Sequence, residues 1–370
     1  MKVGVMTRAL RAPVTGIGRY TQNLLDHLGG ALDGDSLVLF RMRGQNGTGD
    51  LRAENVVAAI PSGHELPRLF WEQVFVPYDV KRLGLDVYHS PNHVLPLAAG
   101  CRTVVTVHDL AFLDRRLFNM RRYLYLNMLT RPSIRKASRI ICISQYTKRE
   151  LEARFPFTRG KTRLVYQGLD ARFESPPPPK AVERFKAREG LRRYVLFMGA
   201  IEPRKNVARL IKAFGRAVHE AEIPHELVIC GPAGWRNDDV RAAWLASPVR
   251  DRIRFASYVP DQDVPLWYAG ADVLAYPSLS EGFGLPALEA MACGTPVVTS
   301  DCSALPEVVG DAAVTVRPRS VRSITGGLLR LLTNPVLAEE LSRRGLERSR
   351  RFDWNTAAAQ TVAVYREAAG

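Results

Sequence analysis

Short apolar runs separated by helical patterns recur along the whole chain, and this alternation constrains the fold more than any other feature. In the first half these runs are typified by Val3–Met6, Thr103–His108 and Ile140–Ile143. In the second half Tyr194–Met198 and Asp272–Tyr276 repeat the pattern. Strands that alternate with helices form parallel sheets whose two faces are covered. We therefore predict an α/β fold of two doubly wound parallel-sheet domains in tandem.

The length of the chain and a run of prolines indicate where the domains meet. A chain of 370 residues is too long for a single hydrophobic core. Pro176–Pro179 cannot lie inside a helix or a strand, and such a run stiffens a linker. We predict an N-terminal domain at 1–174 and a C-terminal domain at 175–352, followed by a helical segment at 353–370.

The composition excludes several classes of protein. A hydrophobic content of 46% with 24% charged residues is typical of a globular chain. No apolar run reaches the roughly 18 residues of a membrane-spanning helix, and the N-terminus lacks the features of a signal peptide, so we expect a cytoplasmic location. Five cysteines without a CxxC or Cys/His cluster predict buried, reduced thiols rather than disulfides or a zinc site.

The charge of the chain is strongly positive and unevenly distributed. The formal net charge is +15, and residues 102–172 alone hold 16 basic and 5 acidic residues. A surface of this kind attracts nucleic acid, anionic lipid headgroups or phosphorylated substrates. A basic surface that serves solubility alone is the alternative, and the composition does not decide between them.

The segment Ser278–Gly294 (SLSEGFGLPALEAMACG) is the most specific motif. Glycines in the loop let the backbone approach a ligand, and the helix that starts near Pro286 offers free amides to a diphosphate. Glu281 lies in the loop before this helix, and Glu289 lies one turn inside it. Two carboxylates so placed can bracket a diphosphate ligand and accept hydrogen bonds from sugar hydroxyls at its two ends. A helix cap and a solvated glutamate would be the structural alternative.

Two further strand-to-helix loops carry residues suited to anion binding. In Gly199–Asn206 (GAIEPRKN), Arg204 and Lys205 can converge on one anion, such as a leaving diphosphate. The loop TGIGRY has Thr21 where the dinucleotide fingerprint requires its third glycine, which argues against an NAD-dependent oxidoreductase. A short glycine loop at a helix N-terminus can still approach a phosphate or a sugar.

Taken together, the motifs TGIGRY, TVVTVHDLAF, GAIEPRKN and SLSEGFGLPALEAMACGTPVV resemble glycosyltransferase family 4 over almost the whole chain. These are retaining nucleotide-sugar enzymes of the GT-B fold, and Glu281 and Glu289 match the family's E-x7-E motif. YHSPNHVLP and VHDLAF, with EPRKN, resemble the mannosyltransferases of bacterial surface polysaccharides. The resemblance implies two Rossmann-like domains with an interdomain cleft, and a last helix that crosses back onto the first domain. The docking face of that helix would be Trp354, Ala358, Val362 and Tyr365.

The resemblance also implies roles for individual residues. Glu281 would hold the hydroxyls of the donor sugar, and Arg204 and Lys205 would neutralise the diphosphate. Glu289 would bind the ribose, and His108 would lie by the anomeric centre and the acceptor. Other substrate-binding positions would be Gly16, Tyr258, Val259, Gly282, Phe283, Gly284 and Leu285. We expect His89 and His93 to be structural or to line a pocket.

The implied reaction transfers a hexose, in our interpretation mannose from GDP-mannose, to a glycan or lipid-linked acceptor with retention of configuration. A UDP-sugar is the alternative donor, and a phosphorylase or an epimerase is the alternative GT-B chemistry. We expect no cofactor and no metal, because Arg204 and Lys205 supply the positive charge. Asp261-Gln262-Asp263 spells the DxD of metal-dependent transferases, but Asp263 is better interpreted as a helix N-cap.

The basic segment 102–172 then has a possible use. Arg115–Arg131 interleaves arginine with apolar side chains and could lie on an anionic inner leaflet, where a lipid-linked acceptor resides. An ordinary amphipathic helix is the alternative. A nucleic-acid-binding protein remains the alternative of a different class, but we expect no nucleic-acid partner, because no nucleic-acid motif is recognised.

Overall fold

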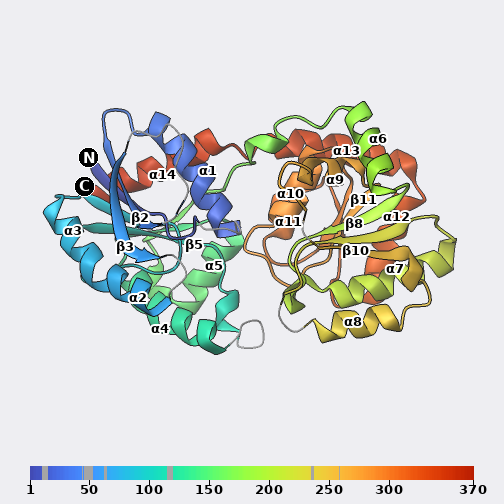
Figure 1. Cartoon of the computed structure of the whole chain (residues 1–370), viewed down its shortest axis with the longest axis horizontal. Coiled ribbons are helices and arrows are strands. Elements are labelled where there is room, and N and C mark those ends of the chain that lie inside the picture. Colours follow the sequence, from blue (N-terminus) through green and yellow to red (C-terminus); the bar gives the residue numbers. More distant parts are fainter. Residues whose placement is uncertain are drawn as a thin grey trace. The chain divides into compact units, whose positions relative to one another are not determined.

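The computed structural model describes residues 1–10, 16–43, 45, 53–61, 65–114, 120–234, 237–257 and 259–370. The chain forms two compact units, which Figure 1 shows with one sheet in each. The first unit comprises residues 1–168 and 353–370, and the second comprises residues 169–352.

The first unit is built on a parallel sheet with the strand order β3-β2-β1-β4-β5-β6-β7. Its strands are β1 (Lys2–Met6), β2 (Ser36–Arg43), β3 (Glu54–Pro61), β4 (Val87–Ser90), β5 (Arg102–Val107), β6 (Arg139–Cys142) and β7 (Thr162–Leu164). Its helices are α1 (Gly16–Ala31), α2 (Glu65–Phe70), α3 (Val76–Arg82), α4 (Met120–Lys136), α5 (Gln145–Arg154) and α14 (Trp354–Ala369), with one π-helical turn, η1 (Trp71–Phe75), between α2 and α3.

The second unit repeats this plan with the strand order β10-β9-β8-β11-β12-β13, again all parallel. Its strands are β8 (Tyr194–Met198), β9 (Glu226–Cys230), β10 (Ile253–Ala256), β11 (Val273–Tyr276), β12 (Val297–Ser300) and β13 (Val314–Val316). Its helices are α6 (Pro179–Glu189), α7 (Val207–Ala221), α8 (Asp238–Leu245), α9 (Val264–Gly270), α10 (Leu285–Ala292), α11 (Leu305–Val309), α12 (Val321–Leu332) and α13 (Pro335–Ser349).

The predicted pair of doubly wound α/β domains is therefore confirmed. In each sheet the strand order reverses beside the first strand, at β1/β4 and at β8/β11. Ligands of doubly wound sheets bind beyond the carboxyl ends of the strands at such switch points. The central strands are buried on both faces, as Val195, Leu196 and Phe197 show with no exposed surface, so each sheet gives the loops at its edge a rigid base.

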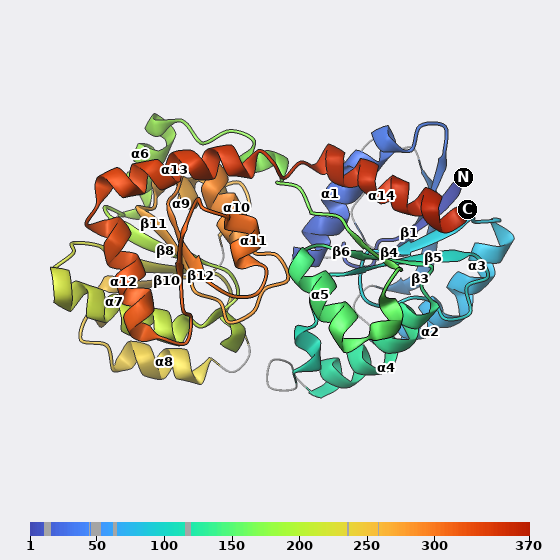
Figure 2. The same ribbon diagram turned by 180° about the vertical axis from the view of Figure 1, so that it is seen from behind.

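The predicted docking of the last helix onto the first unit is also confirmed. Figure 2 shows α14 beside α1, and the two helices are in contact. The predicted face, formed by Trp354, Ala358, Val362 and Tyr365, is buried. The Tyr365 hydroxyl is 2.6 Å from Nδ1 of His89, whose Nε2 lies 2.9 Å from Oγ1 of Thr106. His89 is therefore a core residue that ties α14 to the sheet.

The first unit ends at residue 168, earlier than the expected boundary at 174. The backbone N–H of Leu169 donates to the carbonyl of Phe352 at 2.9 Å, and Phe173 packs edge-on against Tyr268 in the second unit. The proline run does not act as a separate linker, because Pro178 is the N-cap of α6 and Pro179 is its first residue. Proline suits the first turn of a helix, where its missing N–H is not needed.

Side chains fix the ends of several helices. The hydroxyl of Ser144 caps α5, since it accepts from the N–H of Thr147 at 3.0 Å. The segment 320–350 forms two helices, α12 and α13, because the Asn334 side chain caps α13 and Pro335 begins it. The five cysteines are free as predicted, but Cys101 and Cys302 are only half-buried.

Tyr365→Phe should test the attachment of α14. The substitution leaves Nδ1 of His89 without its partner in a core where burial already lowers the pKa of His89 to about 3. We expect a loss of about 1–3 kcal/mol of stability, measured as a lower Tm. Tyr78→Phe is the matched control, since Tyr78 is 66% exposed. Equal Tm values for the two variants would contradict the role of Tyr365.

Candidate active site

Two loops of the second unit are held together at the switch point between β8 and β11. The N–H of Leu279 donates to the carbonyl of Arg204 at 2.7 Å, which joins the loop after β11 to the loop after β8. The amide of Asn206 donates to the carbonyls of Pro277 at 2.9 Å and Pro318 at 2.7 Å. Asn206 has a φ of 64°, a left-handed conformation that asparagine tolerates better than most residues. These bonds fix where the side chains at 204, 205 and 281 lie.

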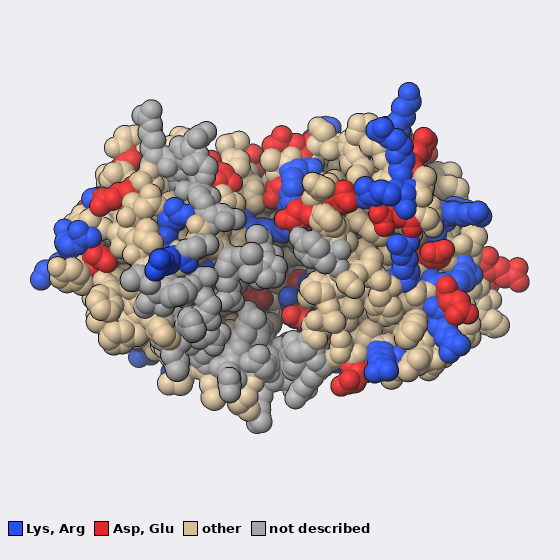
Figure 3. Space-filling model, viewed as in Figure 1, with Lys and Arg blue, Asp and Glu red and all other residues tan. Residues whose placement is uncertain are grey.

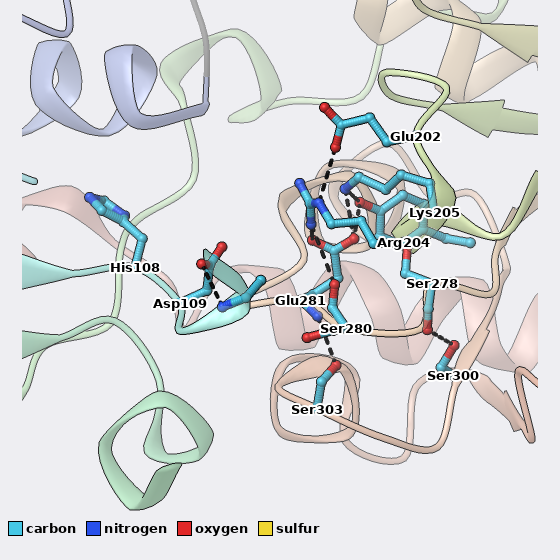
Figure 4. A network of polar contacts seen from close by, with 12 residues as sticks. His108, Asp109, Glu202, Arg204, Lys205, Ser278, Ser280, Glu281, Ser300 and Ser303 are labelled. Carbon is cyan, nitrogen blue, oxygen red and sulfur yellow. Dashed lines mark hydrogen bonds and ion pairs between the residues drawn. The ribbon is translucent and has the colours of Figure 1, made fainter. Parts of the chain in front are cut away.

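Arg204, Lys205 and Glu281 form one cluster at this edge of the sheet (Figure 4). One carboxylate oxygen of Glu281 accepts from Nη1 of Arg204 at 2.9 Å, and the other accepts from Nζ of Lys205 at 2.6 Å. The Tyr276 hydroxyl donates to Glu281 at 2.9 Å and accepts from Lys205. Ser303 accepts from the backbone N–H of Glu281 at 3.1 Å, which fixes the start of the loop. The sequence motifs thus converge on one set of charges.

The cluster is largely buried, and its charges are paired. Glu281 and Lys205 are each 7% exposed, whereas the side chain of Arg204 is 22% exposed. Burial alone would raise the pKa of Glu281, but the charges of Arg204 and Lys205 outweigh it and lower this pKa to about 2. A second carboxylate, that of Glu202, also pairs with Arg204, at 3.1 Å from Nε, so the cations and carboxylates of the cluster are equal in number. The two cations are held in fixed positions, which suits them to contact an anionic ligand group.

The glycine-rich part of the loop is shaped by backbone and packing requirements. Gly284 has a φ of 111°, and a Cβ there would lie 2.5 Å from Cδ2 of Leu305. Phe283 points into the core and meets Phe352 edge-on with ring centroids 5.6 Å apart. Gly282 is buried, and Leu285, the first residue of α10, is half-buried. At Phe283, therefore, only the backbone can contact a ligand.

The other predicted positions of the second unit lie in different surroundings. Glu289, inside α10, accepts from the hydroxyl of Tyr268 at 2.8 Å rather than joining the cluster around Glu281. Val259 is buried, which leaves its backbone as the part that can bind a nucleotide base. Tyr258 lies outside the described residues.

The predicted N-cap position of Asp263 is confirmed. Asp263 occupies the N-cap position of α9, but its side chain makes no capping hydrogen bond and instead accepts from Nη2 of Arg188 at 2.8 Å. The carboxylate bonds Arg188 rather than a backbone N–H of α9, because a hydrogen bond from a charged donor is stronger than one from a neutral N–H. The carboxylate of Asp261 lies 3.8 Å from Arg172. Among the described residues no group of three or more His, Cys, Asp or Glu is arranged to hold a metal ion.

The predicted positions of the first unit lie at the carboxyl edge of its own sheet. His108 follows β5, and its Nε2 donates to the carbonyl of Pro91 at 2.8 Å. Burial lowers the pKa of His108, so its ring is neutral near pH 7. The ring of His93 lies parallel to that of His108 at 6.0 Å, and the backbone N–H of His108 donates to His93. Gly16 begins α1 with open space where a side chain would be.

Sequence reasoning missed three residues that complete the charged cluster of the second unit. Tyr276 contacts both Lys205 and Glu281, Asn206 joins the loops, and Ser303 anchors Glu281. A tyrosine at the carboxyl end of a predicted strand was the one available signal. Ser303 comes from the loop after β12, and nothing in its local sequence links it to Glu281.

Comparisons with known proteins identify the family and the fold of the chain. The profile described as "Glycosyltransferase Family 4" matches residues 14–173, and the one described as "Glycosyl transferases group 1" matches residues 180–348. The fold is similar to that of a sucrose-phosphate synthase from Thermosynechococcus elongatus, with a TM-score of 0.79, 21% identity, and coverage of 99% of this chain and 98% of that one. The two parallel sheets and these matches define a two-unit glycosyltransferase of the GT-B fold.

Two relatives are similar over most of their length. The "O-antigen chain mannosyltransferase B" of Escherichia coli is 30% identical over 384 residues, which cover 99% of this chain and 100% of the relative. The "MMP alpha-(1->4)-mannosyltransferase" of Mycolicibacterium hassiacum is 33% identical over 340 residues, which cover 85% of this chain and 78% of the relative. The chain belongs to glycosyltransferase family 4.

The charge of Glu281 predicts a pH dependence of stability. Its pKa falls from an ordinary value of 4.5 to about 2 in the folded protein. A carboxyl with a depressed folded pKa stabilises the protein above its unfolded pKa, and this stabilisation is lost as the pH falls toward the folded value. Between about pH 5.5 and about pH 3.5, the wild type should lose on the order of 1 kcal/mol that Glu281→Gln does not lose.

Calorimetric Tm values of both proteins at the two pH values measure this effect. The Tm difference between wild type and Glu281→Gln should narrow on acidification. Ser280→Ala, in the same loop, removes no ionisable group, so its Tm difference from wild type should stay constant. A Glu281→Gln difference that also stays constant would show that Glu281 is not held charged by Arg204 and Lys205.

Proposed function

We propose that the chain is a retaining mannosyltransferase that moves mannose from GDP-mannose to a hydroxyl of a glycan or lipid-linked acceptor in the synthesis of a bacterial surface polysaccharide. The clustering of Glu281 between Arg204 and Lys205 carries this proposal. The printed names of the two relatives support the sugar, since both are mannosyltransferases and one acts on an O-antigen chain.

The cluster has the charges that glycosyl transfer from a nucleotide donor requires. As the bond between the sugar and the diphosphate breaks, negative charge grows on the leaving phosphate. Cations held in place before the reaction stabilise that charge without further reorganisation. Lys205 is fixed by Glu281 and Tyr276, and Arg204 by Glu281 and by the carbonyl of Ser280 at 3.4 Å. Glu281 is a charged acceptor for hydroxyls of the donor sugar.

In the proposed reaction the acceptor oxygen forms a bond to the anomeric carbon on the face from which the phosphate leaves. The electron pair of the broken carbon–oxygen bond stays on the phosphate, which takes the proton of the acceptor hydroxyl. The configuration at the anomeric carbon is therefore retained. This route needs no dedicated base, and it gives the neutral His108 of the first unit the role of orienting the acceptor.

We also propose that the reaction needs no divalent metal and no other cofactor. Metal-dependent transferases use the ion to neutralise the diphosphate, and here Arg204 and Lys205 supply two positive charges for the same purpose. Asp261 and Asp263, which match the DxD pattern, are engaged with Arg172 and Arg188. The transfer assay below is therefore run in EDTA, with full wild-type turnover expected.

Lys205→Ala should lower the rate of mannose transfer from GDP-mannose by about 100-fold or more, because a buried cation at the leaving group is lost. Product formation is measured by chromatography with a mannoside acceptor, and NMR of the product should show the anomeric configuration of the donor. Lys212→Ala is the matched control, since Lys212 is exposed on α7 of the same unit. Its rate should equal that of the wild type.

Other outcomes of this assay would overturn parts of the proposal. Transfer from UDP-sugars in place of GDP-mannose would contradict the proposed donor but not the assigned roles of Arg204, Lys205 and Glu281. An inverted product would exclude the same-face reaction. Normal turnover by Lys205→Ala would remove the assigned role of the cluster, and salt-dependent binding of DNA without sugar transfer would favour a nucleic-acid-binding protein.

Surface features of the first unit support peripheral association with an anionic leaflet. Large apolar side chains are exposed on the helical run α2–η1–α3, on the loop after β4 and on α4: Phe70, Val74, Phe75, Tyr78, Leu97, Met120, Leu124 and Met128. The loop links the helices, since Gln73 bonds the backbone of Leu95 and Leu97 while Ser133 accepts from Leu95. We call the eight exposed side chains from Phe70 to Met128 listed above the apolar surface.

Positive charge accompanies the apolar surface. The sequence of α4 holds five basic residues and no acidic residue, and α3 ends with Lys81 and Arg82. Figure 3 shows both basic and acidic side chains on the face of the molecule that it draws. Apolar side chains with adjacent cations suit an interfacial position on anionic lipid. In the described ranges no helix combines the length and the apolar character needed to cross a bilayer.

Flotation with vesicles tests this association. We expect the protein to float with vesicles containing about 30% phosphatidylglycerol and not with neutral phosphatidylcholine vesicles, because anionic lipid attracts the basic helices. Leu124→Ser with Met128→Ser should reduce the floating fraction. Val336→Ser is the control, since Val336 is 76% exposed on α13 of the second unit. Equal flotation with anionic and neutral vesicles, or equal flotation of the wild type and the double variant, would contradict the proposed membrane-binding role of the apolar surface.

A further inference from the structure

A buried ion pair lies at the switch point of the first sheet, and nothing in the proposed chemistry uses it. Arg8 follows β1, and its guanidinium pairs with the carboxylate of Glu72, which is 3% exposed. The same guanidinium donates to the side-chain oxygen of Asn92, in the loop after β4. None of these three residues was expected from the sequence to have a functional role.

Glu72 comes from an unusual backbone element. It lies in the π-helical turn η1, which interrupts the run from α2 to α3. Such turns are rare and frequently occur at functional sites. The next residue, Gln73, donates to the carbonyl of Leu95 at 3.0 Å and accepts from the N–H of Leu97 at 3.0 Å. The turn therefore holds the loop after β4 at two points, at Asn92 through Arg8 and at Leu95–Leu97 through Gln73.

The loop held in this way is the loop that fixes His108. Pro91 precedes Asn92, and its carbonyl accepts from Nε2 of His108 at 2.8 Å. On the other side of Asn92, Nε2 of His93 accepts the backbone N–H of His108 at 3.3 Å. The position and the tautomer of the His108 ring thus depend on where the Pro91–His93 segment lies. That segment in turn depends on the fork of Arg8.

Stability alone is a poor reason for this arrangement. Two buried charges lose their hydration, and replacing such a pair by apolar side chains is often neutral or stabilising. A planar guanidinium that bonds a carboxylate and an amide at once fixes geometry, which a single-point ammonium cannot do. Arg8, Asn92 and His108 follow the adjacent strands β1, β4 and β5, at the edge where doubly wound sheets bind ligands.

We propose that the Arg8–Glu72 pair positions the Pro91–His93 segment, and through it His108, for binding the acceptor hydroxyl. Arg8 and Glu72 are positioning residues in this inference, because they act through Asn92 and His108. The inference rests on the proposed transferase function for its kinetic consequence, but the geometry of His108 can be measured without any substrate.

The decisive protein is the double variant Arg8→Met with Glu72→Leu, which replaces both charges of the ion pair by apolar side chains. We expect it to fold with a Tm close to that of the wild type. Arg8→Lys is a second variant, which keeps the charge but loses the fork. Arg82→Met is the control, because Arg82 forms an exposed pair with Asp79 in the same unit.

The substrate-free measurement is 15N NMR of the histidine rings. Wild type and Arg82→Met should show His108 protonated at Nε2, as the bond to Pro91 requires, whereas the double variant and Arg8→Lys should show shifted His108 signals and a mixture of tautomers. Unchanged His108 signals in the folded double variant would overturn the inference, whether or not the protein transfers sugar.

The kinetic measurement uses GDP-mannose with a methyl mannoside as acceptor. The double variant should raise the acceptor KM by about tenfold or more, because a misplaced His108 would no longer hold the acceptor hydroxyl in the reactive position. The donor KM and the slow hydrolysis of GDP-mannose by water should not change. An unchanged acceptor KM would overturn the inference, whereas absence of transfer by the wild type itself would overturn the proposed function and leave the NMR result to decide the inference.

Discussion

The site of the second unit depends on keeping one buried carboxylate charged. Glu281 is surrounded by Arg204, Lys205 and Tyr276, and these contacts more than offset the cost of its burial. The arrangement is reciprocal, because Glu281 also fixes the two cations. The charges are therefore held in place by the fold, so they can act on a developing charge without first reorganising. The backbone bond between Leu279 and Arg204 and the side chain of Asn206 serve this same end, since they lock the two loops that carry the charges.

Much of the fold could be predicted from the sequence, because the strands of a parallel sheet are buried on both faces and appear as continuous apolar runs. The runs at 194–198 and 140–143 are of this kind, and both correspond to strands. The edge strands β3 and β7 were not recognised. β3 contains the apolar run 56–60, so its signal was present and was overlooked, whereas β7 has only three residues and lacks such a run. The boundary after residue 168 was also missed, because it depends on the contacts of Leu169 and Phe173 with distant residues.

Part of the functional site could likewise be predicted from the sequence, and part depends on the tertiary fold. Glu281, Arg204 and Lys205 stand in short motifs after strands, so their types and positions could be read from the sequence, and the structure brings them within hydrogen-bonding distance. Glu289 belongs to the same motif and was expected at the other end of the ligand, and its carboxylate accepts from Tyr268. The spacing along the helix indicates which side of the helix Glu289 occupies, but Tyr268 as its partner depends on the tertiary fold. Arg8 and Glu72 are separated by 64 residues, and only the tertiary fold pairs them.

The two switch points use one topology for different electrostatic tasks. In the second unit, Arg204 and Lys205 are held by Glu281, and Arg204 also by Glu202, and two cations fixed in this way suit a group that becomes more negative as a bond breaks. In the first unit, Arg8 is balanced by Glu72, and burial keeps His108 neutral. In the proposed function, groups of this kind orient the uncharged hydroxyl of the acceptor. A transferase needs both environments, since it must stabilise an anion on one reactant while it places a neutral nucleophile on the other. The shared strand order supplies the two positions, and the side chains at the strand ends make them different.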